Sequence, residues 1–219
     1  MSDYETHEYD VVVIGAGGAG IRAAIEAARS GAKTAIICKS LLGKAHTVMA
    51  EGGAAAALGN ADDRDGWKTH FKDTMKGGKY LNNWRMAQIH AQESPDRIRE
   101  LEQWGAVFDR TPAGLINQRN FGGHTYPRLA HVADSTGLEI IRTLQEKGIH
   151  SGIDIFMEYT VSQLIQDDDG TCIGCVAYNR VDGAMHAYSA KSTVLATGGI
   201  TRCWSVCSGS WEYTGDGHA

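Results

Sequence analysis

The segment that most constrains the fold is Gly15–Gly20, "GAGGAG", together with what stands on either side of it. Residues 10–14, "DVVVI", are apolar and β-branched after the aspartate, which predicts a buried strand. "IRAAIEAARSG" then predicts a helix that ends at Gly31, and "KTAIICK" predicts a second buried strand. A glycine turn between a strand and a helix, followed by another strand, is typical of a dinucleotide-binding unit.

Each glycine of the G-x-G-x-x-G pattern has a different expected task. Gly15 permits the tight turn, Gly17 lets the backbone approach a pyrophosphate, and Gly20 lets the helix pack on the strand. The first N–H groups of the helix then face the phosphates. The second strand ends in Cys38-Lys39-Ser40, where an acidic residue often binds a ribose diol. This difference leaves the ribose contacts open and disfavours a plain nicotinamide enzyme.

Composition excludes several classes of function. The net charge of −5 and the lack of a basic run argue against a nucleic-acid partner. No stretch of 18 apolar residues predicts a membrane span, and the acidic N-terminus resembles neither a signal nor a transit peptide. Five cysteines, an odd number, fit a reducing cytoplasm. Cys172 and Cys175 form a single C-x-x-C, which is weak support for a metal or redox site.

The rest of the chain divides into long connections, helices and strands. Residues 40–66 and 105–135 predict long connections, and the chain is expected to be helical from Trp84, with Ser94-Pro95-Asp96 starting a helix. A further helix is expected from about Ser135 to Lys147, ending at Gly148. Three strands are expected in "IFMEYTVSQLIQ", "TCIGCVAYNR" and "MHAYSAKSTVLAT", with "DDDG" as a solvated hairpin turn rather than a metal site.

The last strand runs into "VLATGG", Val194 to Gly199. A strand that ends in A-T-G-G after a small antiparallel meander recurs in flavoproteins of the glutathione-reductase-like fold, which favours FAD. The expected class is therefore α/β: a glutathione-reductase-like FAD-binding Rossmann fold with a small antiparallel β-meander. We expect residues 1–219 to form the N-terminal part of that domain. Its expected segments are a βαβ unit at 9–40, a flavin loop at 41–66, a helical segment at 84–148 and the meander at 153–199.

Five blocks of the sequence resemble the flavoprotein subunit of succinate dehydrogenase and fumarate reductase, in the family's order. They are "DVVVIGAGGAGIRAA", "KAHTVMAEGG", "QRNFGGHTYPR", "VLATGG" and "SWEYTGDGHA". In this family a histidine in such an A-H-T context is bonded through its ring to the 8α-methyl of FAD, and His46 occupies that position. The resemblance implies that this bond raises the flavin potential, so that succinate can reduce the flavin.

The resemblance and the glycine turn together assign the following residues. Expected FAD contacts are Gly15, Ala16, Gly17, Gly18, Ala19, Gly20, Cys38, Lys39, Ser40, His46, Thr47, Gly52, Gly53, Ala196, Thr197, Gly198 and Asp216. Gly52, Phe121 and Gly122 are expected beside the substrate. Glu51 stands where the family often has Gln, and His124 departs from the commoner Gln-Ser, so neither receives a role. No metal ligand is expected.

The implied function is that of a fragment of a succinate:quinone oxidoreductase, whose partners are membrane anchor subunits and an iron–sulfur subunit. The resemblance implies a prokaryotic cytoplasmic protein, peripheral on the inner face of the cell membrane. It also places the capping domain and the catalytic arginine beyond Ala219, in a polypeptide roughly 2.5 to 3 times longer. The remaining alternatives are fumarate reduction, a non-catalytic FAD-binding module, and an L-aspartate oxidase-like flavoenzyme, which lacks the linking histidine and is disfavoured by His46.

Overall fold

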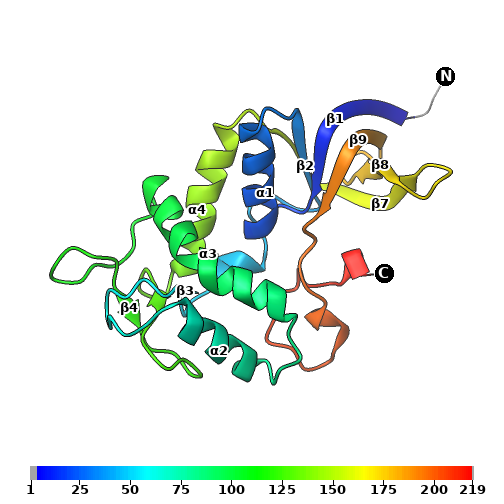
Figure 1. Cartoon of the computed structure of the whole chain (residues 1–219). Helices are drawn as coiled ribbons and strands as arrows, with labels where there is room; N and C mark the ends of the chain where they lie inside the picture. The colour runs from blue at the N-terminus through cyan, green and yellow to red at the C-terminus, as the bar shows by residue number, and fades with distance from the viewer. Residues whose placement is uncertain (1–3, 219) are drawn as a thin grey trace. The chain divides into compact units, whose positions relative to one another are not determined.

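The computed structural model describes residues 4–218. The chain forms two compact units, the first from Met1–Val48 with Leu144–Ala219 and the second from Met49–Thr143. The first unit contains a six-stranded sheet with the strand order β6-β2-β1-β9-β8-β7 (Figure 1). Its strands are β1 (Tyr4–Ile14), β2 (Thr34–Cys38), β6 (Asp154–Met157), β7 (Tyr159–Gln166), β8 (Cys172–Asn179) and β9 (Met185–Leu195).

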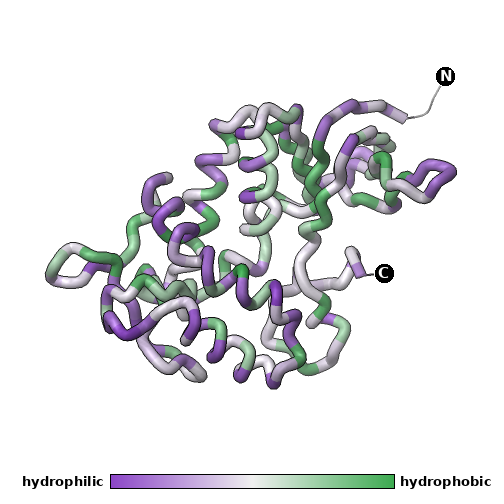
Figure 2. The backbone as a smooth tube through the Cα atoms, viewed as in Figure 1, coloured by the Kyte–Doolittle hydropathy of each residue, from purple (hydrophilic) through white to green (hydrophobic). Residues whose placement is uncertain are grey.

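The sheet is parallel from β6 to β9 and antiparallel from β9 to β7. Helix α1 (Gly18–Arg29) packs against β1 and β2, which completes the strand-turn-helix-strand unit. The residues at the end of β1 are hydrophobic (Figure 2), as suits a strand that is covered on both faces. Val12 and Ile14 belong to a cluster with Tyr188 of β9, and Val13, on the opposite face, is equally buried. The parallel α/β sheet with its antiparallel meander is the expected fold class.

The run "IFMEYTVSQLIQ" forms two strands, so the expectation of one continuous strand was wrong. Glu158 has a φ of 64° and separates β6 from β7. A non-glycine residue in this conformation ends an extended chain, so the two strands diverge. β6 pairs with β2, whereas β7 pairs with β8 at the other end of the strand order. Phe156 and Tyr159, on either side of the break, both pack against the same buried cluster.

In the second unit the sequence predicted a helix from Trp84, but neither the helix before it nor the three-stranded sheet. Helix α2 (Trp67–Gly77) has apolar residues at helical spacing, Trp67, Phe71 and Met75, but fully buries only His70. It lies beside α3 (Trp84–Gln103) in Figure 1. The small sheet has the order β3-β5-β4, from β3 (Ala54–Ala55), β4 (Gln118–Arg119) and β5 (Leu129–Ala130).

Two predicted helix boundaries were also wrong. α3 runs through Pro95, which therefore does not start a helix; Asn83 is the N-cap, and its side chain accepts from the N–H groups of Arg85 and Met86. The proline removes one hydrogen bond of α3 and crowds the preceding turn, and the helix continues with Ala91, Ser94 and Ile98 buried around it. Helix α4 (Thr136–Ile149) includes Gly148 instead of ending before it. A Cβ at Gly148 would lie 3.2 Å from Ile21 of α1, so this glycine permits close helix packing.

Candidate functional site: a glycine-lined cleft

The glycine turn leaves no room for side chains at two of its positions. Gly15 has a φ of 109°, and a Cβ there would lie 2.2 Å from the carbonyl oxygen of Ala196. A Cβ at Gly20 would lie 1.9 Å from the carbonyl oxygen of Gly15, so α1 could not approach β1 as it does. Gly17 is different, because its nearest neighbour would be the Cβ of Ala45 at 3.1 Å. Gly15 and Gly20 therefore fix the backbone, and Gly17 borders an open space.

That space is a cleft at the N-terminus of α1, within the first unit. Its lining comes from five segments: Gly15, Ala16, Gly17, Gly18 and Ala19; Cys38, Lys39, Ser40 and Leu41; Lys44, Ala45, His46 and Thr47; Ala196, Thr197 and Gly198; and Glu212 and Tyr213. The volume of about 230 Å³ is below the ~300–1,000 Å³ of an enclosed ligand pocket. The cleft therefore covers only part of a ligand as large as a dinucleotide.

The electrostatics of the cleft favour an anion. Gly17 is the N-cap of α1 and no acidic side chain lies in the first turn, so the partial positive charge of the helix end is not neutralised. Thr47 Oγ1 accepts from the Gly18 N–H at 3.1 Å, which ties the loop to the helix end. Lys44 adds positive charge to the lining and Glu212 adds negative charge, whereas Lys39 is paired with Asp216. The backbone N–H groups at the end of α1 are the groups that suit a phosphate.

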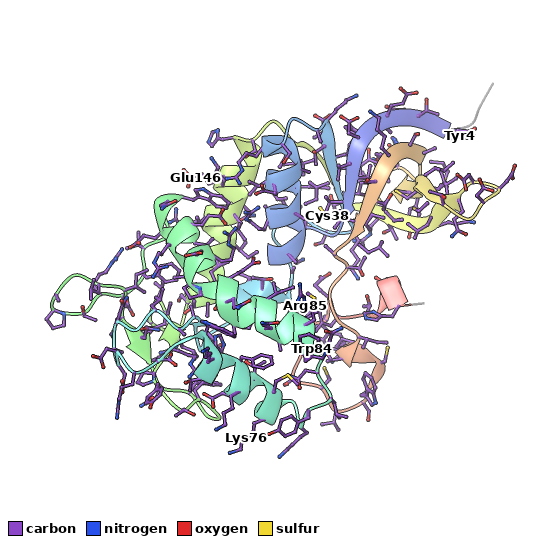
Figure 3. The ribbon with its side chains drawn as sticks, in the orientation of Figure 1. Tyr4, Cys38, Lys76, Trp84, Arg85 and Glu146 are labelled. Atoms are coloured by element: carbon purple, nitrogen blue, oxygen red, sulfur yellow. The ribbon has the colours of Figure 1, made fainter. Side chains whose placement is uncertain are left out.

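An ion pair stands at the end of β2, where an acidic residue is often found. Lys39 Nζ lies 2.8 Å from Asp216 Oδ2 and 2.7 Å from Thr214 Oγ1. The hydrogen bond from Lys39 lowers the pKa of Asp216, which is therefore ionised at pH 7. Cys38, labelled in Figure 3, ends β2 and its Sγ donates to the Ser40 carbonyl at 3.1 Å. Burial raises the pKa of Cys38 to about 11, so its thiol is protonated and unreactive.

His46 begins a 3₁₀ turn (His46–Met49) and its ring is held from two sides. The Ser210 N–H donates to His46 Nδ1 at 3.0 Å, and the Tyr213 ring lies 4.3 Å from the imidazole, centroid to centroid. These contacts join residues more than 160 positions apart in sequence. They fix the plane of the ring in the lining of the cleft and use Nδ1 as an acceptor.

A family model described as "FAD binding domain" matches residues 10–219. The chain belongs to this FAD-binding family. Among solved structures it is similar to Mycobacterium smegmatis Sdh1 in complex with UQ1, with 58% identity and a TM-score of 0.93 over 98% of this chain and 38% of that one. The fold and the cofactor class expected from the sequence are thus confirmed.

Two curated relatives extend the comparison. The mitochondrial succinate dehydrogenase [ubiquinone] flavoprotein subunit of Oryza sativa subsp. japonica is 42% identical over 97% of this chain and 35% of that protein. A subunit of the fumarate reductase (CoM/CoB) of Methanothermobacter marburgensis is 41% identical over 98% of this chain and 39% of that protein. The chain therefore spans a little over a third of the length of these relatives. Within residues 4–218, no helix combines the length and apolarity that a membrane crossing requires.

Most of the sequence-predicted FAD contacts of this FAD-binding domain line the cleft. Among the exceptions in the first unit, Gly20 acts in helix packing, and Asp216 lines two neighbouring hollows and reaches the cleft through Lys39. Sequence reasoning missed Leu41, Lys44, Ala45, Glu212 and Tyr213. Four of these lie inside the blocks "KAHTVMAEGG" and "SWEYTGDGHA", so the sequence resemblance could have identified them as lining residues. Of the two C-x-x-C thiols, Cys175 is fully buried and Cys172 is partly buried.

The remaining predicted residues lie in the second unit. A Cβ at Gly52 would lie 3.1 Å from the Phe121 ring, and one at Gly53 would lie 2.8 Å from the Ala130 carbonyl oxygen. Arg119 Nε donates to the Gly52 carbonyl at 2.8 Å, which holds this turn in place. Phe121 is 58% exposed. Of the four predicted positions of this unit, Gly52, Gly53, Phe121 and Gly122, Gly52 packs beneath the exposed Phe121 ring and Gly53 packs against the Ala130 main chain.

The second unit also contains a buried ionic group that sequence reasoning missed. Arg128 is fully buried, with its Nη2 2.8 Å from Asp65 and 2.9 Å from Asp73. His70 lies nearby, with its ring 5.1 Å from His90. We call the set of six the Arg128 cluster: Arg128, Asp65, Asp73, His70, His90 and His124. Burial, with the nearby His90 and Arg128, lowers the pKa of His70 to about 4, so this ring is neutral at pH 7.

Proposed function

We propose that the whole protein is the flavoprotein subunit of a succinate dehydrogenase that holds FAD in the cleft of the first unit. The observation that carries the proposal is that His46 lines the same cleft as the glycine turn. The similarity to succinate dehydrogenase flavoprotein subunits supports the choice of reaction.

The backbone of the turn is assigned to the pyrophosphate. At Gly17 the main chain borders the cleft with no side chain in between, and the N-terminus of α1 supplies N–H groups and partial positive charge. Lys44 adds a cation to this part of the lining. Lys39 and Asp216, fixed by their ion pair, present a hydrogen-bonding pair at the end of β2 where a ribose would lie.

The role proposed for His46 is to bind FAD covalently through Nε2. Nδ1 already accepts a hydrogen bond from the Ser210 N–H, and a ring substituted at Nε2 keeps the lone pair that this bond needs. Tyr213 holds the ring plane, so the nitrogen is aimed before the cofactor enters. FAD, when bound, supplies the acceptor for the hydride that leaves succinate.

In the second unit, Gly52, Gly53, Phe121 and Gly122 are proposed to form one wall of the dicarboxylate site. The absence of a side chain at Gly52 leaves its main chain next to the exposed Phe121 ring. None of these four residues can act as an acid. Their proposed role is to shape the site, and the proton donor is assigned to a part of the whole protein outside residues 1–219.

The partners proposed are an iron–sulfur subunit, which would take electrons from the flavin, and one or more membrane anchor subunits. Two relatives are named as subunits, which supports assembly with other chains. Because no described helix crosses a membrane, we assign the attachment to the inner face of a prokaryotic cell membrane to these partners.

The test is fluorescence of the covalently bound flavin. The protein, expressed at the full length that its gene encodes, is denatured in acid and run on a gel under ultraviolet light. We expect a fluorescent band that is lost in His46→Ala and kept in His150→Ala, a histidine at the exposed end of α4. A band that persists in His46→Ala would contradict the proposal. His46→Ala should keep some noncovalent FAD and lose succinate oxidation more than fumarate reduction.

Fumarate reduction is the second candidate function, favoured by 41% identity to a protein of a fumarate reductase. It would use the same cleft and the same His46. Assays of the intact complex with succinate and with fumarate distinguish the two directions. The electron acceptor in one assay and the electron donor in the other are chosen so that both reactions have the same free-energy change. A higher turnover with fumarate would assign the protein to this second candidate, and a higher turnover with succinate to the first.

A further inference from the structure

Two histidines and a glutamate meet on the sheet of the first unit, away from the residues that line the cleft. Glu5 and His7 lie on β1, two positions apart, so their side chains share one face of the strand. His186 lies on β9, directly opposite Glu5 in the parallel register. Tyr4, labelled in Figure 3, marks the start of β1 next to this group. Residues almost 180 positions apart in sequence are thus brought into contact.

The ligand atoms of the three residues have the spacing of a metal site. His7 Nε2 and His186 Nδ1 are 3.0 Å apart. The Glu5 carboxylate lies 3.6 Å from His7 Nε2 and 3.8 Å from His186 Nδ1. Atoms that bind Zn²⁺ at about 2.0–2.1 Å in a tetrahedron lie about 3.3 Å from one another. To reach that spacing, the two ring nitrogens would separate by about 0.3 Å and the exposed Glu5 carboxylate would approach by about 0.3–0.5 Å.

The surroundings suit a cation bound at the edge of a buried surface. The His7 and His186 side chains are 15% and 7% exposed, whereas that of Glu5 is 67% exposed. Tyr188 stacks on the His7 ring at 4.7 Å, and Phe156 packs edge-on at 5.0 Å, so the ring is fixed. Burial lowers the pKa of His7, and the neutral ring that results is the form that binds a metal. Solvent can reach the site from the Glu5 side.

We propose that Glu5, His7 and His186 bind Zn²⁺ or a chemically similar divalent transition-metal ion, with water in the fourth position. Two imidazoles and one carboxylate are a ligand set that Zn²⁺ accepts, and three protein ligands with one open position complete a tetrahedron. The ion ties the first half of β1 to β9. Its role is structural, and it is independent of FAD because none of the three residues lines the cleft.

The competing explanation is a direct hydrogen bond between the two rings, with Glu5 as a solvated neighbour. The two explanations differ in what Glu5 does. As a ligand it contributes to metal affinity, whereas as a solvated neighbour its replacement changes nothing. Glu5→Gln is a sharp test because the side chain is mostly exposed and the fold does not depend on it.

The experiment is calorimetric titration of ZnCl₂ into the full-length protein after removal of its affinity tag and treatment with a chelator. We expect one site that is weakened at least about tenfold in Glu5→Gln and lost in His186→Ala. At a free Zn²⁺ concentration 100 times the Kd, the melting temperature should rise by about 5 °C. Circular dichroism reports whether each variant is folded, and His7→Gln replaces His186→Ala if the latter unfolds.

His150→Ala, which removes an exposed histidine elsewhere in the first unit, is the matched control and should bind Zn²⁺ like the wild type. Two results would overturn the proposal. One is the absence of binding to the wild-type protein at millimolar Zn²⁺. The other is a Kd that is the same in the wild type, in Glu5→Gln and in the histidine variant.

Discussion

The cleft of the first unit and the Arg128 cluster of the second are both polar, yet they are built in opposite ways. The cleft is formed mainly by main chain, in which glycines remove side chains and the end of α1 supplies the charge. The Arg128 cluster is formed by side chains that are fully or partly buried, and its central guanidinium is held by two carboxylates. The cleft therefore leaves room for a ligand, whereas the charged side chains of the Arg128 cluster pair with one another.

If the second unit depends on those charges, the largest effect should follow from removing one of them. Arg128→Met leaves Asp65 and Asp73 without a buried partner, and we expect the free energy of unfolding to fall by about 3–5 kcal/mol. Urea unfolding measures the change. Arg85→Met, at an exposed position labelled in Figure 3, is the control and should change it by less than about 0.5 kcal/mol. A loss below about 1 kcal/mol in Arg128→Met would mean that the ion pairs do not hold the second unit.

If the first unit depends on glycines that lack side chains, substitutions at these glycines should have two kinds of effect, on stability or on flavin content. Gly15→Val combines backbone overlap with a positive φ, and we expect it to destabilise the protein by about 3 kcal/mol or more. Gly17→Val should fold, because its side chain would enter the cleft, but it should purify without yellow colour. Thermal melts and flavin absorbance distinguish the two. A Gly17→Val protein with wild-type flavin content would show that the turn is not the phosphate site.

The Arg128 cluster also predicts that stability depends on pH between about 4 and 6.5. The folded-state pKa of His70, about 4, lies below the unfolded value of 6.5, so the unfolded chain binds the proton first as pH falls. The contribution of His70 is complete above pH 6.5 and is lost as pH falls toward 4. Between pH 7.5 and pH 5 this should remove about 2 kcal/mol of stability. Urea unfolding of His70→Gln at both pH values should show a smaller loss; an equal loss would assign the dependence to other groups.

The smallest effect should come from the ion pair at the mouth of the cleft. Lys39 and Asp216 are both partly exposed, so Lys39→Met should lower the free energy of unfolding by less than about 1 kcal/mol. Lys191→Met, which breaks an even more exposed pair with Asp10, provides the comparison. A loss of several kcal/mol in Lys39→Met, measured by urea unfolding, would show that the main-chain cleft depends on charge as the Arg128 cluster does.

The same contrast explains what could be predicted from the sequence. The glycine turn is local, since six consecutive residues and their flanking strand and helix determine it, and the structure shows β1, α1 and β2 there. Tyr213 was missed because its contact with His46 depends on the path of a distant segment. The Arg128 cluster was missed for the same reason, because Asp65 and Arg128 are 63 positions apart. The prediction that a helix starts at Pro95 was wrong because tertiary packing sustains a helix that proline locally disfavours.

The central claim is that the cleft of the first unit holds FAD bonded to His46. The most direct measurement is mass spectrometry of a tryptic digest of the full-length protein. Trypsin cuts after Lys44 and Arg64, so His46 lies in the peptide 45–64, which contains no other histidine. We predict that this peptide carries the mass of FAD, that fragmentation places it on His46, and that the peptide is unmodified in His46→Ala. An unmodified wild-type peptide from protein that contains flavin, or flavin on another residue, would contradict the claim.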